Sequence, residues 1–255
     1  MANINIIGAG NVAWHISNAL SNTNFQIQQI YSRSFSSAQQ LANTFGYQAV
    51  NALENFKEAK AIIIAVDDDQ IEKVSQQLGN VGDALVIHTS GSVSIDALLP
   101  HQNRAVLWLI ESLTKGEKLS YNKIPAIVHY ANAYSNNLVY EIAKSISNVV
   151  HILADKERRA LHLGAVMANN FSNHLFTLLK NFTHEKNIDF SLLQPIINST
   201  FHSAQQKEPY AMQTGPAIRH DKKTIMNHLK ILQQNTQLTE IYNTFTKSIQ
   251  ATHNI

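Results

Sequence analysis

Apolar and polar positions divide the chain into two parts that differ in periodicity. In the first part, short apolar runs alternate with segments of helical spacing, a pattern typical of a parallel sheet whose strands are joined by helices. The predicted strands are Ile4–Ile7, Gln26–Tyr31, Ala61–Val66, Ala84–His88, Ala105–Leu109, Ala126–Tyr130 and Val149–Leu153. After Leu153 the pattern predicts only helices. This change predicts an α/β domain at 1–153 and an all-α domain at 154–255.

The second part has the spacing of amphipathic helices. A long helix is predicted at about 156–181, with Asp155 as its N-terminal cap. Two further helices are predicted at Leu192–Ala204 and Lys222–Gln234, the latter capped by Asp221. No low-complexity linker marks the boundary near Leu153, so its position depends on the change of periodicity alone.

The composition is that of a globular protein, with 44% hydrophobic and 15% charged residues over 255 positions. That length suits two domains of about 100–200 residues each. The net charge of +2 comes from scattered cations without interleaved aromatic residues, which gives no support for nucleic-acid binding. The chain has no cysteine, so disulfides, thiolate catalysis and cysteine-ligated metals are excluded.

The longest wholly apolar run, Ala61–Val66, is far too short to span a membrane. The N-terminal residues also lack the basic-then-apolar layout of a signal peptide. We therefore expect a cytoplasmic protein that binds neither membranes nor nucleic acid.

The first predicted strand runs directly into a turn that contains two glycines. Gly8 permits a tight turn, Gly10 lets backbone amides approach a pyrophosphate, and Ala13 allows the next helix to pack on the sheet. The helix N-terminus adds partial positive charge. Strand, turn and helix follow in the order of a dinucleotide site, which we assign to Gly8, Gly10, Asn11 and Val12.

The segment after the second strand predicts NADP rather than NAD. An NAD site has an Asp or Glu about 20 residues after the glycines to hold the ribose 2′-hydroxyl, but no acidic residue precedes Glu54 here. Arg33, between Ser32 and Ser34, is the only Lys or Arg before Lys57. Its guanidinium is suited to a 2′-phosphate. The alternative is an exposed loop arginine in a fold that binds no nucleotide.

Ligands of an open parallel sheet lie beyond the carboxyl ends of its strands. Val66 ends the third predicted strand and is therefore expected beside the cofactor. The three aspartates at 67–69 are interpreted as a helix cap and first turn, in preference to metal ligands or acid/base groups. The segment 88–92, His-Thr-Ser-Gly-Ser, follows the next strand. Ser90 is a candidate contact for the nicotinamide amide or a substrate oxygen, and an ordinary Ser/Gly loop is the alternative.

Between Leu161 and Leu179 the long helix has no charged residue. A helix face turned to bulk water usually carries Lys and Glu, so uncharged amides and imidazoles indicate a cleft or a subunit contact. The candidates on this face are His162, Asn169, Asn170, Asn173 and His174. Their alternative role is to satisfy buried backbone groups or neighbouring helices.

A turn-forming stretch at 213–221 leads into the last predicted helix. The Thr214 hydroxyl, the Gly215 amide and the Arg219 guanidinium suit a carboxylate or phosphate of a substrate. Alternatively, Arg219 pairs with Asp221 and fixes the helix start. None of the 12 histidines has another four residues away with a Glu between them, so no metal site is expected.

Four motifs in this order resemble a family of uncharacterised bacterial proteins labelled NADP oxidoreductases, in which a Rossmann-like domain precedes a helical domain of unknown function. The match spans nearly the whole chain. The motifs are the glycine turn at 8–13, the segment 88–92, the helix residues from His162 through Asn170 to His174, and Thr214-Gly215-Pro216-Ala217 with Arg219, Asp221 and His228.

The family is similar to pyrroline-5-carboxylate reductase, 6-phosphogluconate and β-hydroxyacid dehydrogenases, and deazaflavin-dependent NADP reductases. The resemblance implies a Rossmann-like, mostly parallel sheet with helices on both faces, followed by an all-α domain like the C-terminal domain of 6-phosphogluconate dehydrogenase. It also implies a substrate cleft between the domains and a homodimer formed through the helical domain. The family usually has a Tyr-Pro-Leu-Gln-like stretch after the sixth strand, where this chain has Trp-Leu-Ile-Glu at 108–111.

A second departure concerns the proton donor. β-Hydroxyacid dehydrogenases place a lysine one helical turn before an asparagine, but here Val166 precedes Asn170 by one turn. Lysine-based alcohol oxidation is therefore not expected, and a proton would come from His162, His174, Ser90 or water. Imine reduction needs less acid catalysis when the substrate is an iminium ion, so it fits these residues better.

The first hypothesis is an NADP-dependent reductase of a small carbonyl or imine compound. Arg33 selects the cofactor, Ser90, His162, Asn170 and His174 form the reaction site, and the loop with Thr214 binds the substrate. The alternative is a non-catalytic NADP(H)-binding regulatory or sensor protein, which the missing lysine favours. A third hypothesis is hydride exchange with a deazaflavin.

Overall fold

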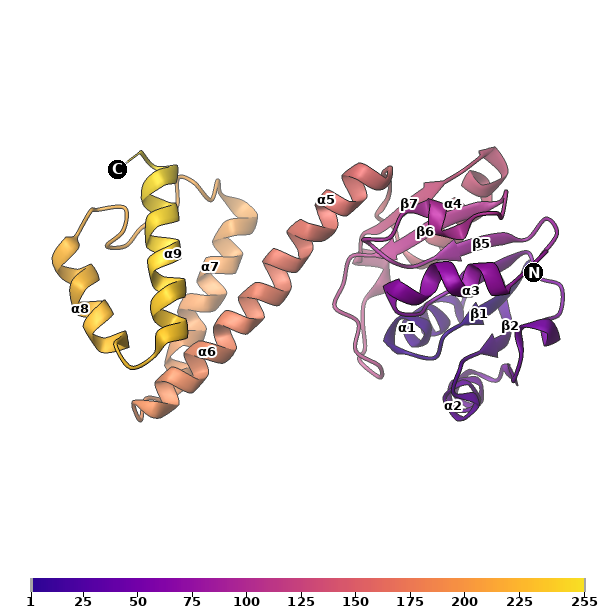
Figure 1. The fold of residues 1–255 in the computed structure, drawn as a ribbon, viewed down its shortest axis with the longest axis horizontal. Coiled ribbons are helices and arrows are strands. Elements are labelled where there is room, and N and C mark those ends of the chain that lie inside the picture. Colours follow the sequence, from indigo (N-terminus) through magenta and orange to yellow (C-terminus); the bar gives the residue numbers. More distant parts are fainter. Residues whose placement is uncertain (1, 255) are drawn as a thin grey trace. The chain divides into compact units, whose positions relative to one another are not determined.

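The chain folds into two compact units, of which the first ends at Asn170 and the second begins at Phe171. The structure is a computed structural model, and it describes residues 2–254. In Figure 1 the first unit contains the whole sheet, and the second consists of helices and their connections. Among the described residues, no helix combines the length and apolar character that crossing a bilayer requires.

The first unit is built on an 8-stranded sheet with the order β3-β2-β1-β4-β5-β6-β7-β8. All neighbouring pairs are parallel except β6 and β7, which are antiparallel. The strands are β1 Ala2–Ile7, β2 Phe25–Tyr31, β3 Gln48–Val50, β4 Ala61–Ile64, β5 Leu85–His88, β6 Arg104–Leu109, β7 Ala126–Tyr130 and β8 Val150–Ile152. The chain crosses from β3 to β4 on the other side of β1, which places the carboxyl ends of β1 and β4 beside each other.

Helices and short turns cover both faces of this sheet. The helices that pack on it are α1 Asn11–Leu20, α2 Phe35–Phe45, α3 Ile71–Gln77 and α4 Ala133–Ile146, and the 3-10 turns are η1 Leu53–Asn55, η2 Asp68–Gln70, η3 Ile95–Leu98 and η4 Tyr121–Lys123. Helix α5 Asp155–Ala165 follows β8. Successive side chains of a strand point to opposite faces. Ile63 of β4 accordingly packs in a cluster with α1, α2 and α4, whereas Ile62 and Ile64 pack in a cluster with α3 and η3. The predicted fold class, a mostly parallel sheet between helices, is confirmed.

Helix α5 belongs to the first compact unit, which continues past Leu153 to Asn170. Asp155 was expected to cap this helix, and that prediction is wrong. Ala154 is the N-cap, without a side-chain hydrogen bond. The Asp155 carboxylate binds Ser94, Ile95, His129 and Arg158 instead, which leaves no oxygen for the amides of its own helix.

The second unit begins within a π-helical segment, η5 Val166–Phe171. This segment interrupts the long helix that the sequence predicts and divides it into α5 and α6. The other elements are α6 Ser172–Glu185, η6 Phe190–Leu193, α7 Gln194–Gln206, α8 Lys222–Leu232 and α9 Thr236–Thr252. Asp221 caps α8 as predicted, because its side chain accepts a hydrogen bond from Thr224 N. The sequence prediction did not include β3 or α9.

Candidate functional site

The turn between β1 and α1 requires glycine at its first position. Gly8 has φ +114°, and a Cβ there would lie 2.0 Å from the Ala65 carbonyl oxygen. Its N–H donates to the Tyr31 carbonyl at 2.8 Å, which fixes the turn to the end of β2. The turn therefore lies close against the carboxyl ends of β2 and β4, as in a dinucleotide-binding fold.

The N-terminus of α1 is open to a ligand. Gly10 is the N-cap and provides no side chain to bind the first amides of the helix, and the space beside its Cα is free of protein atoms to 4 Å. Uncapped N–H groups together with the helix dipole form a ready anion site. The Asn11 side chain accepts from Lys115 N at 3.1 Å and so connects this helix to the loop after β6.

A cavity of about 420 Å³ extends from this helix start to the end of β2. It is lined by most of the residues that the sequence assigned to the cofactor, namely Gly8, Gly10, Asn11, Val12, Ser32, Arg33 and Val66. Ser34 is not among its lining residues, because its hydroxyl caps α2 by accepting from Ser37 N. The volume and the glycine turn fit part of a dinucleotide.

Arg33 lies at the exposed end of this cavity. Within residues 2–254 its guanidinium forms no ion pair, whereas Arg104 and Arg158 each pair with an aspartate. No carboxylate among the residues that line the cavity near β2 takes the position of an NAD-specific acid, since the lining aspartate, Asp67, follows β4. The charge at the end of β2 is thus purely positive, which suits a phosphate group.

A second, more polar cavity of about 300 Å³ adjoins the first and shares Asn11 and Val12 with it. Its other lining residues come from five places in the sequence, namely helix α1, η2, the loop after β5, β6 with the loop after it, and helix α5. They are Ile16, Asp68, Thr89, Ser90, Gly91, Leu107, Trp108, Leu109, Glu111, Leu113 and His162. Two of the predicted reaction-site residues, Ser90 and His162, therefore line one cavity of the first unit.

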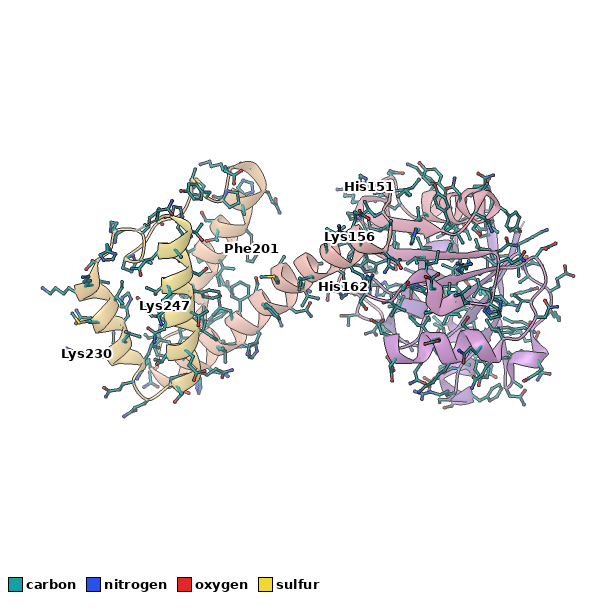
Figure 2. The ribbon with its side chains drawn as sticks, turned by 45° about the horizontal axis from the view of Figure 1, so that its top comes forward. His151, Lys156, His162, Phe201, Lys230 and Lys247 are labelled. Carbon is teal, nitrogen blue, oxygen red and sulfur yellow. The ribbon has the colours of Figure 1, made fainter. Side chains whose placement is uncertain are left out.

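His162 lies directly against Gly91. A Cβ on Gly91 would be 2.4 Å from the His162 ring and 2.7 Å from the Trp108 ring, so no side chain fits there. The two rings meet edge to face, with centroids 5.4 Å apart. Figure 2 shows His162 on the helix that leaves the sheet domain. Glycine in the 88–92 segment thus permits this close contact between α5 and the loop.

The Ser90 hydroxyl organises its own loop. Its Oγ accepts hydrogen bonds from Ser92 N at 3.0 Å and Val93 N at 3.1 Å, which leaves its proton available to another acceptor such as Ser92 Oγ. His88, at the end of β5, is fully buried and accepts from Ser90 N at Nδ1. Burial, followed by the nearby charge of Arg158, lowers the pKa of His88 to about 4, so this imidazole is neutral at pH 7.

Two carboxylates line the second cavity, and the sequence interpretation gave neither a site role. Asp68 binds the Ser92 hydroxyl, and Glu111 accepts from Ser112 N at 2.8 Å. The aspartates at 67–69 were interpreted as a helix cap, and Asp67 does occupy the N-cap position of η2, but without a side-chain hydrogen bond. Only the pairing of distant segments by the sheet brings Asp68 and Glu111 to one cavity, which is why no sequence pattern indicates it.

The remaining predicted site residues do not line these two cavities. Asn170 is exposed in the π-helical segment, at the end of the first unit. His174 is exposed in the second unit, where Gln237 approaches it at 3.4 Å.

Thr214, Gly215 and Arg219 share one loop of the second unit, with Gly215 at φ +105°. Thr214 lines an apolar cavity of about 270 Å³ between α6 and α9. Among the described residues, no group of three His, Asp or Glu side chains is arranged to hold a metal ion.

Two family models match the chain. Residues 3–91 match a family described as NADP oxidoreductase coenzyme F420-dependent, and residues 124–249 match a domain of unknown function. No curated protein sequence matches the chain.

Several solved structures are similar over nearly the whole chain. A "putative NADP oxidoreductase" from Bacteroides fragilis is 29% identical, with a TM-score of 0.89 over 100% of this chain and 98% of that one. A protein from Thermotoga maritima is 23% identical, with a TM-score of 0.76 over 98% of both chains. An imine reductase from Myxococcus stipitatus, solved with NADP+, is 13% identical, with a TM-score of 0.69 over 98% and 93%.

These matches confirm the resemblance stated from the sequence. The NADP oxidoreductase model covers the glycine turn and extends to Gly91, and the domain of unknown function extends from the start of β7 into α9, the last helix. The imine reductase and the Thermotoga protein are less than 25% identical to this chain, so they support its fold alone.

Proposed function

We propose that the protein is an NADP-dependent oxidoreductase that transfers a hydride between NADP(H) and a small carbonyl or imine compound. The observation that carries the proposal is the cavity at the glycine turn, with the uncapped N-terminus of α1 at one end. At the other end lies Arg33, which forms no ion pair within the described range 2–254. The match of residues 3–91 to an NADP oxidoreductase family supports it. When bound, the dinucleotide would supply or accept the hydride.

Each part of the first cavity would hold a different part of the cofactor. The amides that begin α1, next to Gly10 and Asn11, would bind the pyrophosphate. Arg33, with Ser32 and Ser34 beside it, would bind the 2′-phosphate. Val66 would provide an apolar contact at the end of β4, on the way to the second cavity.

The second cavity would hold the reacting part of the substrate. Five side chains there can donate a hydrogen bond, namely Asn11, Thr89, Ser90, Trp108 and His162, and we assign Ser90 and His162 to the reaction. Asp68 and Glu111 make the cavity acidic. An acidic cavity stabilises a cation, so these residues favour an iminium substrate over a neutral ketone. We assign substrate contacts also to Asn170, His174, Thr214, Gly215 and Arg219, the last three for an anionic group.

The test is calorimetric titration with NADPH and with NADH. Arg33→Ala should weaken NADPH binding by about 10- to 100-fold, because it removes charged hydrogen bonds of about 1.5–3 kcal/mol. NADH binding should remain nearly unchanged. Lys73→Ala, an exposed cation on α3, serves as the control and should alter neither affinity. An equal loss for both nucleotides would contradict the 2′-phosphate role of Arg33, and no heat from the native protein would contradict the cofactor itself.

A second candidate function is a non-catalytic NADP(H) sensor, which Val166 favours because it stands where related dehydrogenases have a lysine. Steady NADPH oxidation with any member of an imine and ketoacid panel would exclude the sensor. The name of the family matched by residues 3–91 also favours a deazaflavin as hydride partner, and this is tested by adding that coenzyme in place of a substrate.

We propose further that the second unit binds a second copy of the chain. Large apolar side chains of its helices are exposed, including Leu192 at 71% and Ile196 at 65%. Monomeric proteins rarely expose such groups together. A homodimer would cover them without requiring any other partner.

A further inference from the structure

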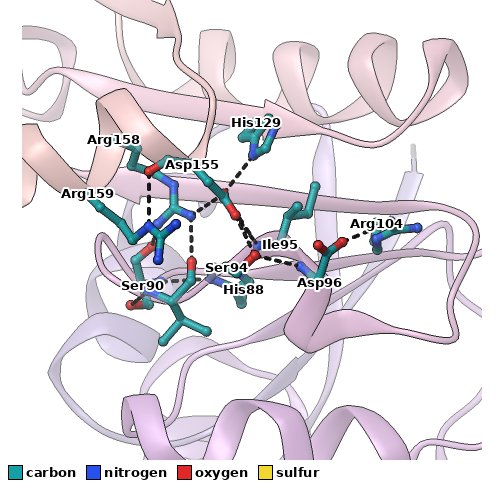
Figure 3. A network of polar contacts seen from close by, with 11 residues as sticks. His88, Ser90, Ser94, Ile95, Asp96, Arg104, His129, Asp155, Arg158 and Arg159 are labelled. Atoms are coloured by element: carbon teal, nitrogen blue, oxygen red, sulfur yellow. Dashed lines mark hydrogen bonds and ion pairs between the residues drawn. The ribbon is translucent and has the colours of Figure 1, made fainter.

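A buried arginine joins helix α5 to the loop that lines the second cavity. Arg158, in the first turn of α5, is 0% exposed. Its Nη1 donates to the Ser90 carbonyl at 2.9 Å, and its Nη2 donates to the Val93 carbonyl (Figure 3). Both acceptors belong to the backbone of the loop after β5. The planar guanidinium therefore binds the backbone of that loop and not its side chains, so these bonds depend on the conformation of the backbone.

Asp155 holds the arginine from the other side. Its carboxylate accepts from Arg158 Nη2 at 2.6 Å, from His129 Nδ1 at 2.9 Å and from Ile95 N at 3.1 Å, and it binds the Ser94 hydroxyl as well. Burial alone would raise the pKa of Asp155, but the hydrogen bonds from Ser94 and Arg158 and the charge of Arg158 hold it well below its usual range. The pair is therefore ionised throughout the physiological range.

The same helix contacts the same loop a second time. His162 follows Arg158 by four residues and lies on the same face of α5, where its ring packs against Gly91. The loop is thus fixed at Ser90 and Val93 by hydrogen bonds and at Gly91 by a contact that tolerates no Cβ. Any shift of α5 along the loop would break both sets of contacts.

The hydrogen bond from Arg158 to the Ser90 carbonyl also fixes the orientation of the peptide group between Ser90 and Gly91. In a trans peptide the C=O and the following N–H point in opposite directions. The Gly91 N–H therefore points away from Arg158, and within residues 2–254 it donates to no protein acceptor. Ser90 and Gly91 both line the second cavity, so the bond from Arg158 fixes the orientation of a peptide in the wall of this cavity.

We propose that Arg158 and Asp155 are positioning residues that hold the Ser90–Gly91 peptide and the His162 ring in a fixed mutual arrangement around the second cavity. Neither residue touches the substrate. A buried ion pair that loses one partner, or a guanidinium that loses its acceptors, is strongly unfavourable, so the arrangement is rigid. The consequence for catalysis rests on the proposed function, whereas the positioning itself does not.

The test compares Arg158→Lys with the native protein by hydrogen exchange and by NMR of the His162 ring. Lysine keeps the charge beside Asp155 but replaces the fork by a single ammonium group, which cannot hold both carbonyls. We expect the amides of 88–95 to exchange about tenfold faster while those of β1 and β4 keep their rates. The His162 ring signals should shift. Arg159→Lys, an exposed neighbour in the same turn, should change none of these readouts.

If Arg158→Lys does not fold, His129→Gln decides, because it alters one hydrogen bond to the Asp155 carboxylate and none within the loop after β5. Native exchange in 88–95 and native His162 signals in the variant that folds would overturn the proposal. A uniform rise in exchange across the whole first unit would also overturn it, since that is the result of a merely structural role. With any substrate that supports turnover, kcat should fall about tenfold while NADPH affinity changes less than about threefold. Failure of the native protein to bind NADPH would contradict the proposed function, whereas the hydrogen-exchange comparison would still test the positioning role of Arg158.

Discussion

The two units of the chain bury their side chains very differently. In the first unit, strands β1, β4 and β5 carry apolar residues that are fully buried on both faces of the sheet. In the second unit, as far as Asn254, the buried residues are Thr183, Ala217 and Leu238. Helices α6, α8 and α9 of the second unit are nevertheless as amphipathic as α1 and α4 of the first. Helical periodicity therefore does not indicate how much of a helix its own chain covers.

The physical reason lies in what each element packs against. Six strands of the sheet, β1, β2, β4, β5, β6 and β7, place buried apolar side chains against helices of the same unit. The core of the first unit therefore closes within one chain. The apolar stripes of α7 and α8 end on the surface of the single chain, at Ile196 and Ile231. A second copy, as proposed above, would give those stripes their partner.

The largest expected effect concerns this exposed surface. Ile196→Glu places a charge among the apolar side chains of α7 and should convert a homodimer to a monomer, halving the mass measured by light scattering. Tyr134→Glu, at an apolar side chain that is 42% exposed on α4 of the first unit, should leave the mass unchanged. A native protein that is already monomeric at micromolar concentration would contradict the proposed dimer.

The second effect compares two isoleucines. Ile63→Ala in β4 removes a side chain that is 0% exposed and should lower the free energy of unfolding by about 2–5 kcal/mol in urea titrations. In the monomeric Ile196→Glu background, Ile231→Ala in α8, where the side chain is 56% exposed, should cost less than about 0.5 kcal/mol. Equal losses in that background would contradict the comparison, because they would show that the single chain already covers Ile231.

The third effect is a pH dependence that originates in the first unit, at His88. Folding lowers the pKa of His88 from 6.5 to about 4, so between these values the unfolded chain binds a proton that the folded chain does not. The free energy of unfolding should be constant above pH 6.5 and fall by about 3 kcal/mol as the pH drops to 4.

His88→Gln removes the titrating group, so its stability should depend much less on pH over that interval. His151→Gln, at an exposed histidine of β8, should retain the native profile. Identical slopes for His88→Gln and the native protein, measured by urea unfolding at each pH, would show that His88 is not the group responsible.

Much of the first unit could be predicted from the sequence, because the relevant signals are local. The seven predicted strands all occur, and Ala126–Tyr130 has the predicted bounds. Strand β3 was missed because three residues, Gln48–Val50, are too few to show a period. Helix α9 at Thr236–Thr252 was not predicted although its amphipathic pattern is present in the sequence. No residue type in the sequence indicates the π-helical turn, so the sequence predicts one long helix where the structure has α5 and α6.

The residues of the candidate site likewise fall into those that local sequence signals predict and those that only the fold brings together. Gly8, Gly10 and Arg33 could be found because a strand, a turn and a missing acid occur within one short stretch. Asp68 and Glu111 could not, since they reach one cavity only through the order of the strands. Asp155 looked like an ordinary helix cap, and its actual partners Ser94, His129 and Arg158 are identifiable only once the loop after β5 and helix α5 are placed together.

Trp108 gives the second cavity a fluorescence signal of its own. The chain has two tryptophans, Trp14 and Trp108, and both belong to the first unit. Trp108 lines the cavity and meets the His162 ring edge to face. Indole emission overlaps the absorption of reduced nicotinamide, so a nicotinamide ring entering this cavity would accept energy from Trp108. The protein thus carries its own fluorescent reporter at the place where its chemistry is proposed, and Trp108→Phe would separate that signal from the emission of Trp14.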